Sequence, residues 1–233
     1  MAYYGARLLK RVSKTEKKRI SVFMGFLLAG LSASMTAAAA ENGNGDEAAA
    51  EAPAVYMTTD LSAEGLLSVY GALEASPSGN IAVKLSTGEP GSNYLRTELI
   101  GDLVQSFDNP TIVECNTAYG GSRANTVMHY QVAEDHGYTA IANVDIMDEE
   151  GSMTLPVTGG SNLTENYVGA HFVNYDYYVV LSHFKGHAMA GYGGAIKNIS
   201  IGIASAEGKS HIHSGGTGGS MRKPSGWGAE PMS

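Results

Sequence analysis

Hydrophobic residues recur with two different spacings along the central part of the chain. Three segments carry an apolar side chain at every third or fourth position, which is typical of amphipathic helices. These segments are 62–75, 94–107 and 124–137. Short apolar runs, each with the length of a buried strand, lie before, between and after them. These runs are 55–59, 81–86, 111–115, 140–146 and 179–184.

This alternation of strands and helices predicts an α/β domain over residues 55–214. The expected architecture has three layers, with a mostly parallel sheet and right-handed helical crossovers. Residues 41–54 contain no large apolar side chain and are expected to form a disordered linker. Residues 215–233 are rich in glycine and show no periodicity, so we expect a disordered tail.

Polar, glycine-rich segments follow four of the predicted strands. They are 87–96, 116–123, 145–151 and 183–194. In open α/β sheets, ligands bind outside the carboxyl ends of the strands, because the loops that follow parallel strands meet there. We therefore expect these four segments to converge on one edge of the sheet and to build a ligand site.

The segment from Ser182 to Asn198 combines histidine, lysine and glycine and contains no acidic residue. Imidazole exchanges protons near neutral pH, and a lysine attracts anions. The candidate catalytic residues are therefore His183, His187 and Lys197. Glycines would let an anion approach the backbone and the first turn of a following helix; the alternative is a loop whose histidines cap carbonyls. These glycines are Gly191, Gly193 and Gly194.

The two earlier loops offer further polar side chains for an anion or a cofactor. An arginine on the first turn of a helix can bind a carboxylate or phosphate through two parallel hydrogen bonds. The candidate binding residues are Glu89, Asn93, Arg96, Asn116 and Arg123. The alternative interpretation is a pair of β–α turns in which Glu89 is solvated.

Two histidines near the end of the chain form an H-x-H pair. In an extended strand, His211 and His213 would lie on the same side and present two nitrogens to a metal ion, with His187 as a third candidate ligand. The alternative is a surface pair in an unstructured tail. The acidic segment 145–151 either holds a hard cation or forms a solvated turn. The other histidines are interpreted as structural; they are His129, His136 and His171.

The amino-terminal segment has the features of a secretory signal. Basic residues dominate the first twenty positions, an apolar run covers 20–35, and small residues follow at Ala38 and Ala40. We expect residues 1–40 to be a signal peptide and the protein to be exported to the periplasm or the extracellular space, with no membrane attachment after cleavage. An uncleaved membrane anchor is the alternative.

Charge and cysteine content narrow the expected partners to a small molecule or a metal ion. Residues 41–233 hold 8 basic and 22 acidic residues, a formal charge of −14, which disfavours binding to nucleic acid. Cys115 is the single cysteine, so an intrachain disulfide is excluded. We expect a buried, unreactive thiol there. The sequence specifies no cofactor beyond a possible metal ion and no oligomeric state.

Four motifs within residues 55–220 carry a resemblance to a known family. They are KLSTGEPGSNYLR, NTAYGGSR, LSHFKGHAMAGYGGAIKNISIGIASAEGK and HIHSGG. Together they resemble domain-of-unknown-function family 362, whose members are often described as uncharacterised iron–sulfur-centre proteins. The resemblance implies an α/β fold and a site built from loops, without a settled activity.

This sequence departs from the family pattern in two respects. Many members carry a cysteine-rich, ferredoxin-like segment, whereas this chain has Cys115 alone, so we expect no iron–sulfur cluster from this chain by itself. Members also usually continue for a further α/β segment. We therefore expect a chain truncated at its carboxyl end, with a sheet that is incomplete there.

The spacing of His187, Lys197 and His213 is similar to a pattern in the nickel-dependent lactate racemases. In that family, a histidine transfers protons, a lysine anchors a nickel pincer cofactor and a later histidine ligates nickel. The similarity covers the H-x9-K and K-x15-H spacings and little more. It implies that these three side chains face one cavity.

These features favour an exported protein with a loop-built anion- or metal-binding site. Redox or proton-transfer chemistry on a small carboxylate or a cofactor is the catalytic hypothesis. The alternatives are a non-catalytic module that binds a metal or a small anion, and an inactive fragment of a longer family member.

Overall fold

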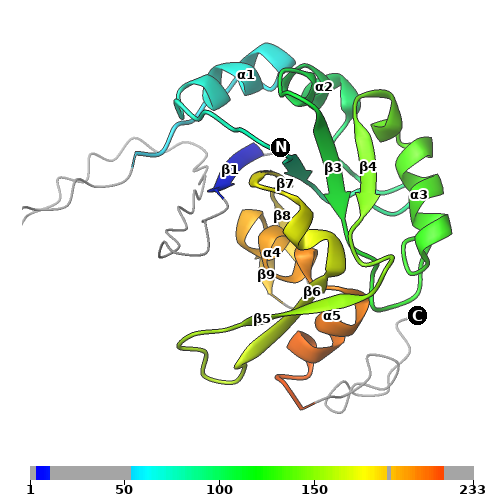
Figure 1. Ribbon diagram of the computed structural model, residues 1–233. Coiled ribbons are helices and arrows are strands. Elements are labelled where there is room, and N and C mark those ends of the chain that lie inside the picture. The colour runs from blue at the N-terminus through cyan, green and yellow to red at the C-terminus, as the bar shows by residue number, and fades with distance from the viewer. Residues whose placement is uncertain (1–3, 11–53, 188–189, 218–233) are drawn as a thin grey trace, which may run out of the picture.

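The computed structural model describes residues 4–10, 54–187 and 190–217, and it shows an α/β fold in three layers (Figure 1). A five-stranded sheet has the order β1-β7-β2-β3-β4. Four neighbouring strands run parallel, and β1 pairs with β7 in the antiparallel direction. The strands are β1 (Tyr4–Lys10), β2 (Ile81–Lys84), β3 (Pro110–Glu114), β4 (Asn143–Ile146) and β7 (Tyr177–His183). The predicted fold class, a mostly parallel α/β sheet with helical crossovers, is confirmed.

Three helices cover one face of the sheet. They are α1 (Ala63–Gly71), α2 (Thr97–Gln105) and α3 (Thr126–Asp135), followed by the 3-10 helix η1 (Tyr138–Ala140). Side chains cap two of the helices, since Ser62 accepts a hydrogen bond from the Gly65 N–H and Asn125 accepts one from the Met128 N–H. Alternate residues of the central strands, such as Val83, pack against apolar side chains of these helices in the larger core.

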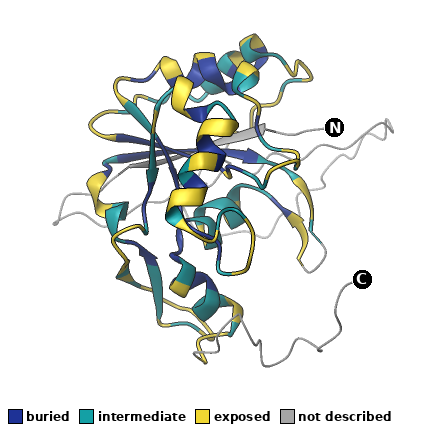
Figure 2. Ribbon diagram, turned by 90° about the vertical axis from the view of Figure 1, so that its right-hand side faces the viewer, coloured by how far each residue is buried: buried dark blue, intermediate teal, exposed yellow. Residues whose placement is uncertain are grey.

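The other face of the sheet is covered by a smaller layer. It contains the hairpin β5 (Ser152–Pro156) and β6 (Glu165–Gly169), the 3-10 helices η2 (Ala170–Asn174) and η3 (Ile201–Ile203), and the helices α4 (Ala195–Ile199) and α5 (Ala206–His213). A second core lies on this side and includes Ala82, Val113 and Tyr178. The central strands β2, β3 and β7 are therefore largely buried, while the outer faces of the helices are exposed (Figure 2).

Cys115 follows β3 and lies in the second core. Its side chain is 1% exposed, and its Sγ donates a hydrogen bond to the Ile203 carbonyl of η3 at 3.3 Å. Burial raises the pKa of the Cys115 thiol to about 12. The expected burial of this thiol is confirmed, and its raised pKa is consistent with low reactivity.

Most predicted elements have their counterparts in the structure, and two predictions are wrong. Residues 55–59 form no strand. The segment with His211 and His213 belongs to α5 and is not extended, because Ser205 caps this helix through the Gly208 N–H. The hairpin β5–β6 lies in a stretch where no regular element was predicted.

The predicted signal peptide and tail lie largely outside the described residues. Of the first 40 residues, 4–10 are described, as β1. Residues 11–53, which include the apolar run and nearly all of the expected linker, and residues 218–233 are outside. In the described part of the chain, no helix is long and apolar enough to cross a membrane.

Candidate functional site

The carboxyl ends of β2, β3, β4 and β7 lie at one edge of the sheet, because the four strands are parallel neighbours. The four glycine-rich or acidic segments predicted from the sequence all leave the sheet at this edge. Their convergence is therefore a consequence of the observed topology.

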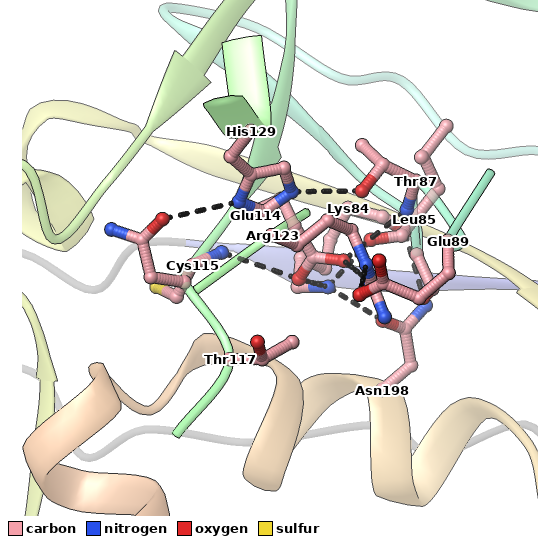
Figure 3. A network of polar contacts seen from close by, with 12 residues as sticks. Lys84, Leu85, Thr87, Glu89, Glu114, Cys115, Thr117, Arg123, His129 and Asn198 are labelled. Carbon is pink, nitrogen blue, oxygen red and sulfur yellow. Dashed lines mark hydrogen bonds and ion pairs between the residues drawn. The ribbon is translucent and has the colours of Figure 1, made fainter. Parts of the chain in front are cut away.

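A buried ion pair joins the ends of β2 and β3 (Figure 3). Lys84 is fully buried, and its Nζ lies 2.8 Å from Glu114 Oε1. The same Nζ donates to Asn198 Oδ1 at 2.6 Å and to the Leu85 carbonyl at 2.6 Å. All three protons of the ammonium group therefore have an acceptor, as the burial of a charge requires.

Arg123 extends this network to the surface. Its Nε donates to Glu89 Oε1 at 2.9 Å, and its Nη1 lies 3.6 Å from Glu114 Oε2. Glu89 Oε2 also accepts from the Ser122 N–H at 2.9 Å. Glu89 and Arg123 are thus brought together as predicted, but they pair with each other and tie the β2 and β3 loops. The predicted role of Glu89 and Arg123 in binding an anion or a cofactor stays a prediction.

A buried histidine closes the network on the side of α3. His129 Nε2 lies 2.8 Å from Thr87 Oγ1, and Nδ1 lies 3.3 Å from Asn116 Oδ1. Burial lowers the pKa of His129 to about 4, although Glu114 opposes the shift. The imidazole is therefore neutral at pH 7, and its contacts fit the structural role predicted for it. Asn116 contacts His129 from the β3 loop.

The smaller layer contributes two further polar side chains to this edge. Asn198 of α4 accepts from Lys84 and donates through Nδ2 to Ser182 Oγ at 2.9 Å and to the Leu181 carbonyl at 3.0 Å. Lys209 of α5 donates to the Ala204 carbonyl at 2.5 Å, and burial lowers its pKa. Asn198 therefore fixes α4 to the ends of β2 and β7.

A short hairpin after β7 carries the histidine and lysine of the densest sequence segment. It consists of β8 (Lys185–His187) and β9 (Gly191–Gly193). Lys185 pairs with Gly193, and His187 pairs with Gly191. Directly paired residues in an antiparallel ladder lie on the same face, so both basic side chains share a face on which β9 contributes glycines alone.

Lys197 of α4 packs on this face. A Cβ on Gly193 would lie 3.4 Å from Lys197 Cδ, so the lysine stem occupies the space beside that glycine. Gly191 has φ +74°, a conformation that favours glycine at the hairpin turn. These two glycines therefore have conformational and packing roles. Their predicted part in anion binding, like that of Gly194, has no further support from the geometry.

Burial and neighbouring positive charges lower the pKa values of three basic groups in this region. Partial burial, Lys197 and Lys185 lower the pKa of His187. Partial burial and Lys185 lower the pKa of Lys197. Partial burial, Lys197 and His187 lower the pKa of His213. The predicted residues His187, Lys197 and His213 thus interact electrostatically, and with Lys185 they form what we call the basic face.

Hydrogen bonds orient two histidines near the basic face. His187 Nδ1 accepts from the Ala190 N–H at 3.1 Å, so a neutral imidazole carries its proton on Nε2. His183 Nδ1 lies 3.1 Å from the Asn93 carbonyl, to which it donates. His183 thereby links β7 to the β2 loop through the backbone of Asn93. The side chain of Asn93 is not part of this bond.

The two histidines of α5 do not form the predicted pair on one side of a strand. Residues two apart in an α-helix differ in direction by about 200°. The ring of His211 lies 4.8 Å from that of Tyr167, whereas His213 interacts with Lys197 and His187. His213 therefore interacts electrostatically with His187, whereas His211 contacts Tyr167, and the metal-ligand role expected of His187, His211 and His213 stays a prediction.

Arg96 lies apart from the basic face in its contacts. Its guanidinium is 3.9 Å from the centroid of the Tyr94 ring, and the same ring stacks on His136 with the centroids 3.7 Å apart. His136 Nδ1 also donates to the Thr87 carbonyl at 2.8 Å. Arg96 is the N-cap residue of α2 but makes no side-chain capping bond. Its proposed role toward an anion stays a prediction.

Four residues of this edge are absent from the candidate site residues predicted from the sequence. They are Lys84, Glu114, Asn198 and Lys209. A signal was present for the first two, because IAVKL and TIVEC each place one charged residue near the end of an otherwise apolar strand. A charge in such a run has to be paired when it is buried, and neighbouring parallel strands supply the pair.

The described geometry can be compared with known families. A domain of unknown function, DUF362, matches residues 81–224, more than half of the chain. The chain belongs to the DUF362 family. The match begins with β2 and includes both the buried ion pair and the basic face of this DUF362 domain. No curated protein and no solved structure matches the chain.

Proposed function

We propose that the DUF362 domain binds a small anion, a carboxylate or a phosphate group of a substrate or cofactor, on its basic face. The observation that supports this most is the grouping of basic side chains from β8, α4 and α5, where burial and neighbouring positive charges lower the pKa values of His187, Lys197 and His213. Lys185 and Lys197 repel each other there, and a bound anion would relieve this repulsion. An anion at this place would supply the missing opposite charge.

The protonation states suit proton transfer as well as binding. Because their pKa values are lowered, His187 and His213 are neutral at pH 7 and can accept a proton from a bound molecule. The charge on Lys197 would hold the anionic group. Proton-transfer chemistry on a small carboxylate is therefore the catalytic form of the proposal, and a non-catalytic anion carrier is its alternative.

Replacing Lys197 by methionine should weaken anion binding by about tenfold or more, because a charged hydrogen bond contributes about 1.5–3 kcal/mol. Isothermal titration calorimetry of the full chain with inorganic phosphate and with acetate measures this. Arg96→Met is the matched control and should bind like the parent. Loss of binding in Arg96→Met alone would place the anion at the β2 loop, and no saturable binding in the parent would contradict the proposal.

His187→Ala separates an enzyme from a carrier. In an enzyme, the variant still binds the anion but loses turnover, because a proton-transfer group is missing. In a carrier, the affinity itself falls. Neutral His187 and His213 are also suitable metal ligands, which favours a metal at the basic face as the second candidate. Mass-spectrometric metal analysis of the full chain, with and without His187→Ala, tests it.

We also propose that the protein is exported and that residues 1–40 are removed, which would take away β1 and leave β7 as an edge strand of the sheet. The basic start, the apolar run 20–35 and the small residues before Glu41 support this proposal. Amino-terminal sequencing of the protein from its producing cells should begin at Glu41. A sequence that begins at Met1 in a membrane fraction would favour the anchored alternative.

A further inference from the structure

A second group of possible ligand side chains lies at β4, the edge strand on the side of the sheet away from β7. Asp145 belongs to the edge strand β4, Glu149 to the turn after it, and His171 to η2. One ligand atom of each residue lies within 4.8 Å of those of the other two. Two strands, β2 and β3, separate β4 from β7, which leads into the basic face.

The backbone holds these three segments together. The His171 N–H donates to the Met147 carbonyl at 3.0 Å, and the Ala170 N–H donates to the Gly151 carbonyl at 2.9 Å, so η2 is fixed against the turn after β4. The Glu149 N–H donates to the Ile146 carbonyl at 2.9 Å and closes that turn. Asp145 and Glu149 belong to the acidic segment 145–151, and tertiary structure adds His171 to them.

Two tyrosines fix the orientation of the carboxylates. Tyr175 donates to Asp145 Oδ2 at 2.6 Å, and Tyr130 donates to Glu149 Oε2 at 3.0 Å. On Asp145, the second oxygen, Oδ1, lies 2.8 Å from His171 Nδ1. In metal sites, residues that do not bind the ion typically donate hydrogen bonds to a ligand carboxylate and so fix its orientation. This arrangement differs from an acidic surface cluster because it includes an imidazole and oriented oxygens.

We propose that Asp145, Glu149 and His171 bind one divalent transition-metal ion. Two carboxylate oxygens and one imidazole nitrogen suit zinc or manganese, whereas the imidazole makes the set less suitable for calcium. Ligand atoms about 2.1 Å from an ion lie roughly 3–4 Å apart, so small side-chain rotations suffice to close the site. The metal would replace the proton between Asp145 and His171, and three protein ligands would leave further positions for water.

Calorimetric titration of the full chain tests this, after removal of metal with a chelator and with ZnCl2, MnCl2 and CaCl2 as the probes. We expect one zinc or manganese ion per chain and weaker binding of calcium. Glu149→Gln should weaken zinc binding by about tenfold or more. Glu98→Gln is the matched control, because Glu98 is an exposed glutamate of α2 outside the three ligands, and the affinity should change less than about fivefold. Glu150 does not serve as a control, since its Oε2 lies 3.3 Å from His171 Nε2.

The result must also be distinguished from a metal at the basic face. His187→Ala should leave zinc binding unchanged, and circular dichroism should show that every variant is folded. Binding that Glu149→Gln leaves intact would overturn the proposal, as would binding that disappears in His187→Ala. Failure of all three metal ions to bind the folded parent would overturn it too. None of these outcomes depends on anion binding.

Discussion

Replacing Lys84 by methionine should lower the free energy of unfolding by about 3–5 kcal/mol, the largest effect that we expect from a single substitution here. Methionine has a similar volume but leaves Glu114, which is 4% exposed, without its closest counter-charge. It also removes the donor to Asn198 Oδ1. Chemical denaturation followed by circular dichroism measures the change.

A control variant and a double variant show whether the loss of stability comes from the buried ion pair. Lys185→Met replaces an exposed lysine and should alter stability by less than about 0.5 kcal/mol. The double variant Lys84→Met, Glu114→Leu should lose less than the sum of the single variants, because it removes both charges of the pair. A Lys84→Met protein as stable as Lys185→Met would mean that the buried pair does not stabilise the fold.

The free energy of unfolding should also fall as the pH is lowered from 6.5 to 2, in two overlapping steps. Burial lowers the pKa of His129 from 6.5 to about 4. Between pH 6.5 and 4, His129 is therefore protonated in the unfolded chain but neutral in the folded protein, which favours unfolding. Burial alone would raise the pKa of Glu114, but Lys84 and Arg123 bring it down from 4.5 to about 2. Each step corresponds to roughly 3 kcal/mol.

Unfolding curves at several pH values, for the parent and two variants, separate the steps. His129→Gln should flatten the dependence between pH 6.5 and 4, and Glu114→Gln should flatten it between 4.5 and 2. Comparison with the parent cancels the contributions of other titrating groups. A parent whose stability is constant down to pH 4 would contradict the buried, neutral state of His129.

The strands of the parallel sheet could be predicted because each is a short apolar run that adjoins a segment with the hydrophobic periodicity of a helix. The run 55–59 satisfied the same pattern without being a strand, since pairing depends on a neighbour that the pattern does not show. At 211–213, two histidines in alternation suggested a strand. The N-cap Ser205 and the acidic Glu207 in the first turn of α5 were the stronger signal.

The site could be predicted in part. His187, Lys197 and His213 were chosen from spacing and residue type, and in the structure these three side chains interact electrostatically. The partner of Lys84 could not be chosen in this way, because it depends on which strands are neighbours. Of the proposed metal ligands, Asp145 and Glu149 lie in the acidic segment noted from the sequence, but His171 could not be added to them, because η2 returns to β4 through the unpredicted β5–β6 hairpin.

The rate at which a thiol reagent labels the buried Cys115 would report local unfolding of the layer that covers it. Cys115 lies between β3 and η3, so a labelling reagent reaches it only when the smaller layer lifts from the sheet or the whole domain unfolds. Labelling rates compared with global stability would therefore show whether α4 and α5, which carry Lys197 and His213, open as a separate unit. No engineered cysteine is required, because the chain contains no other.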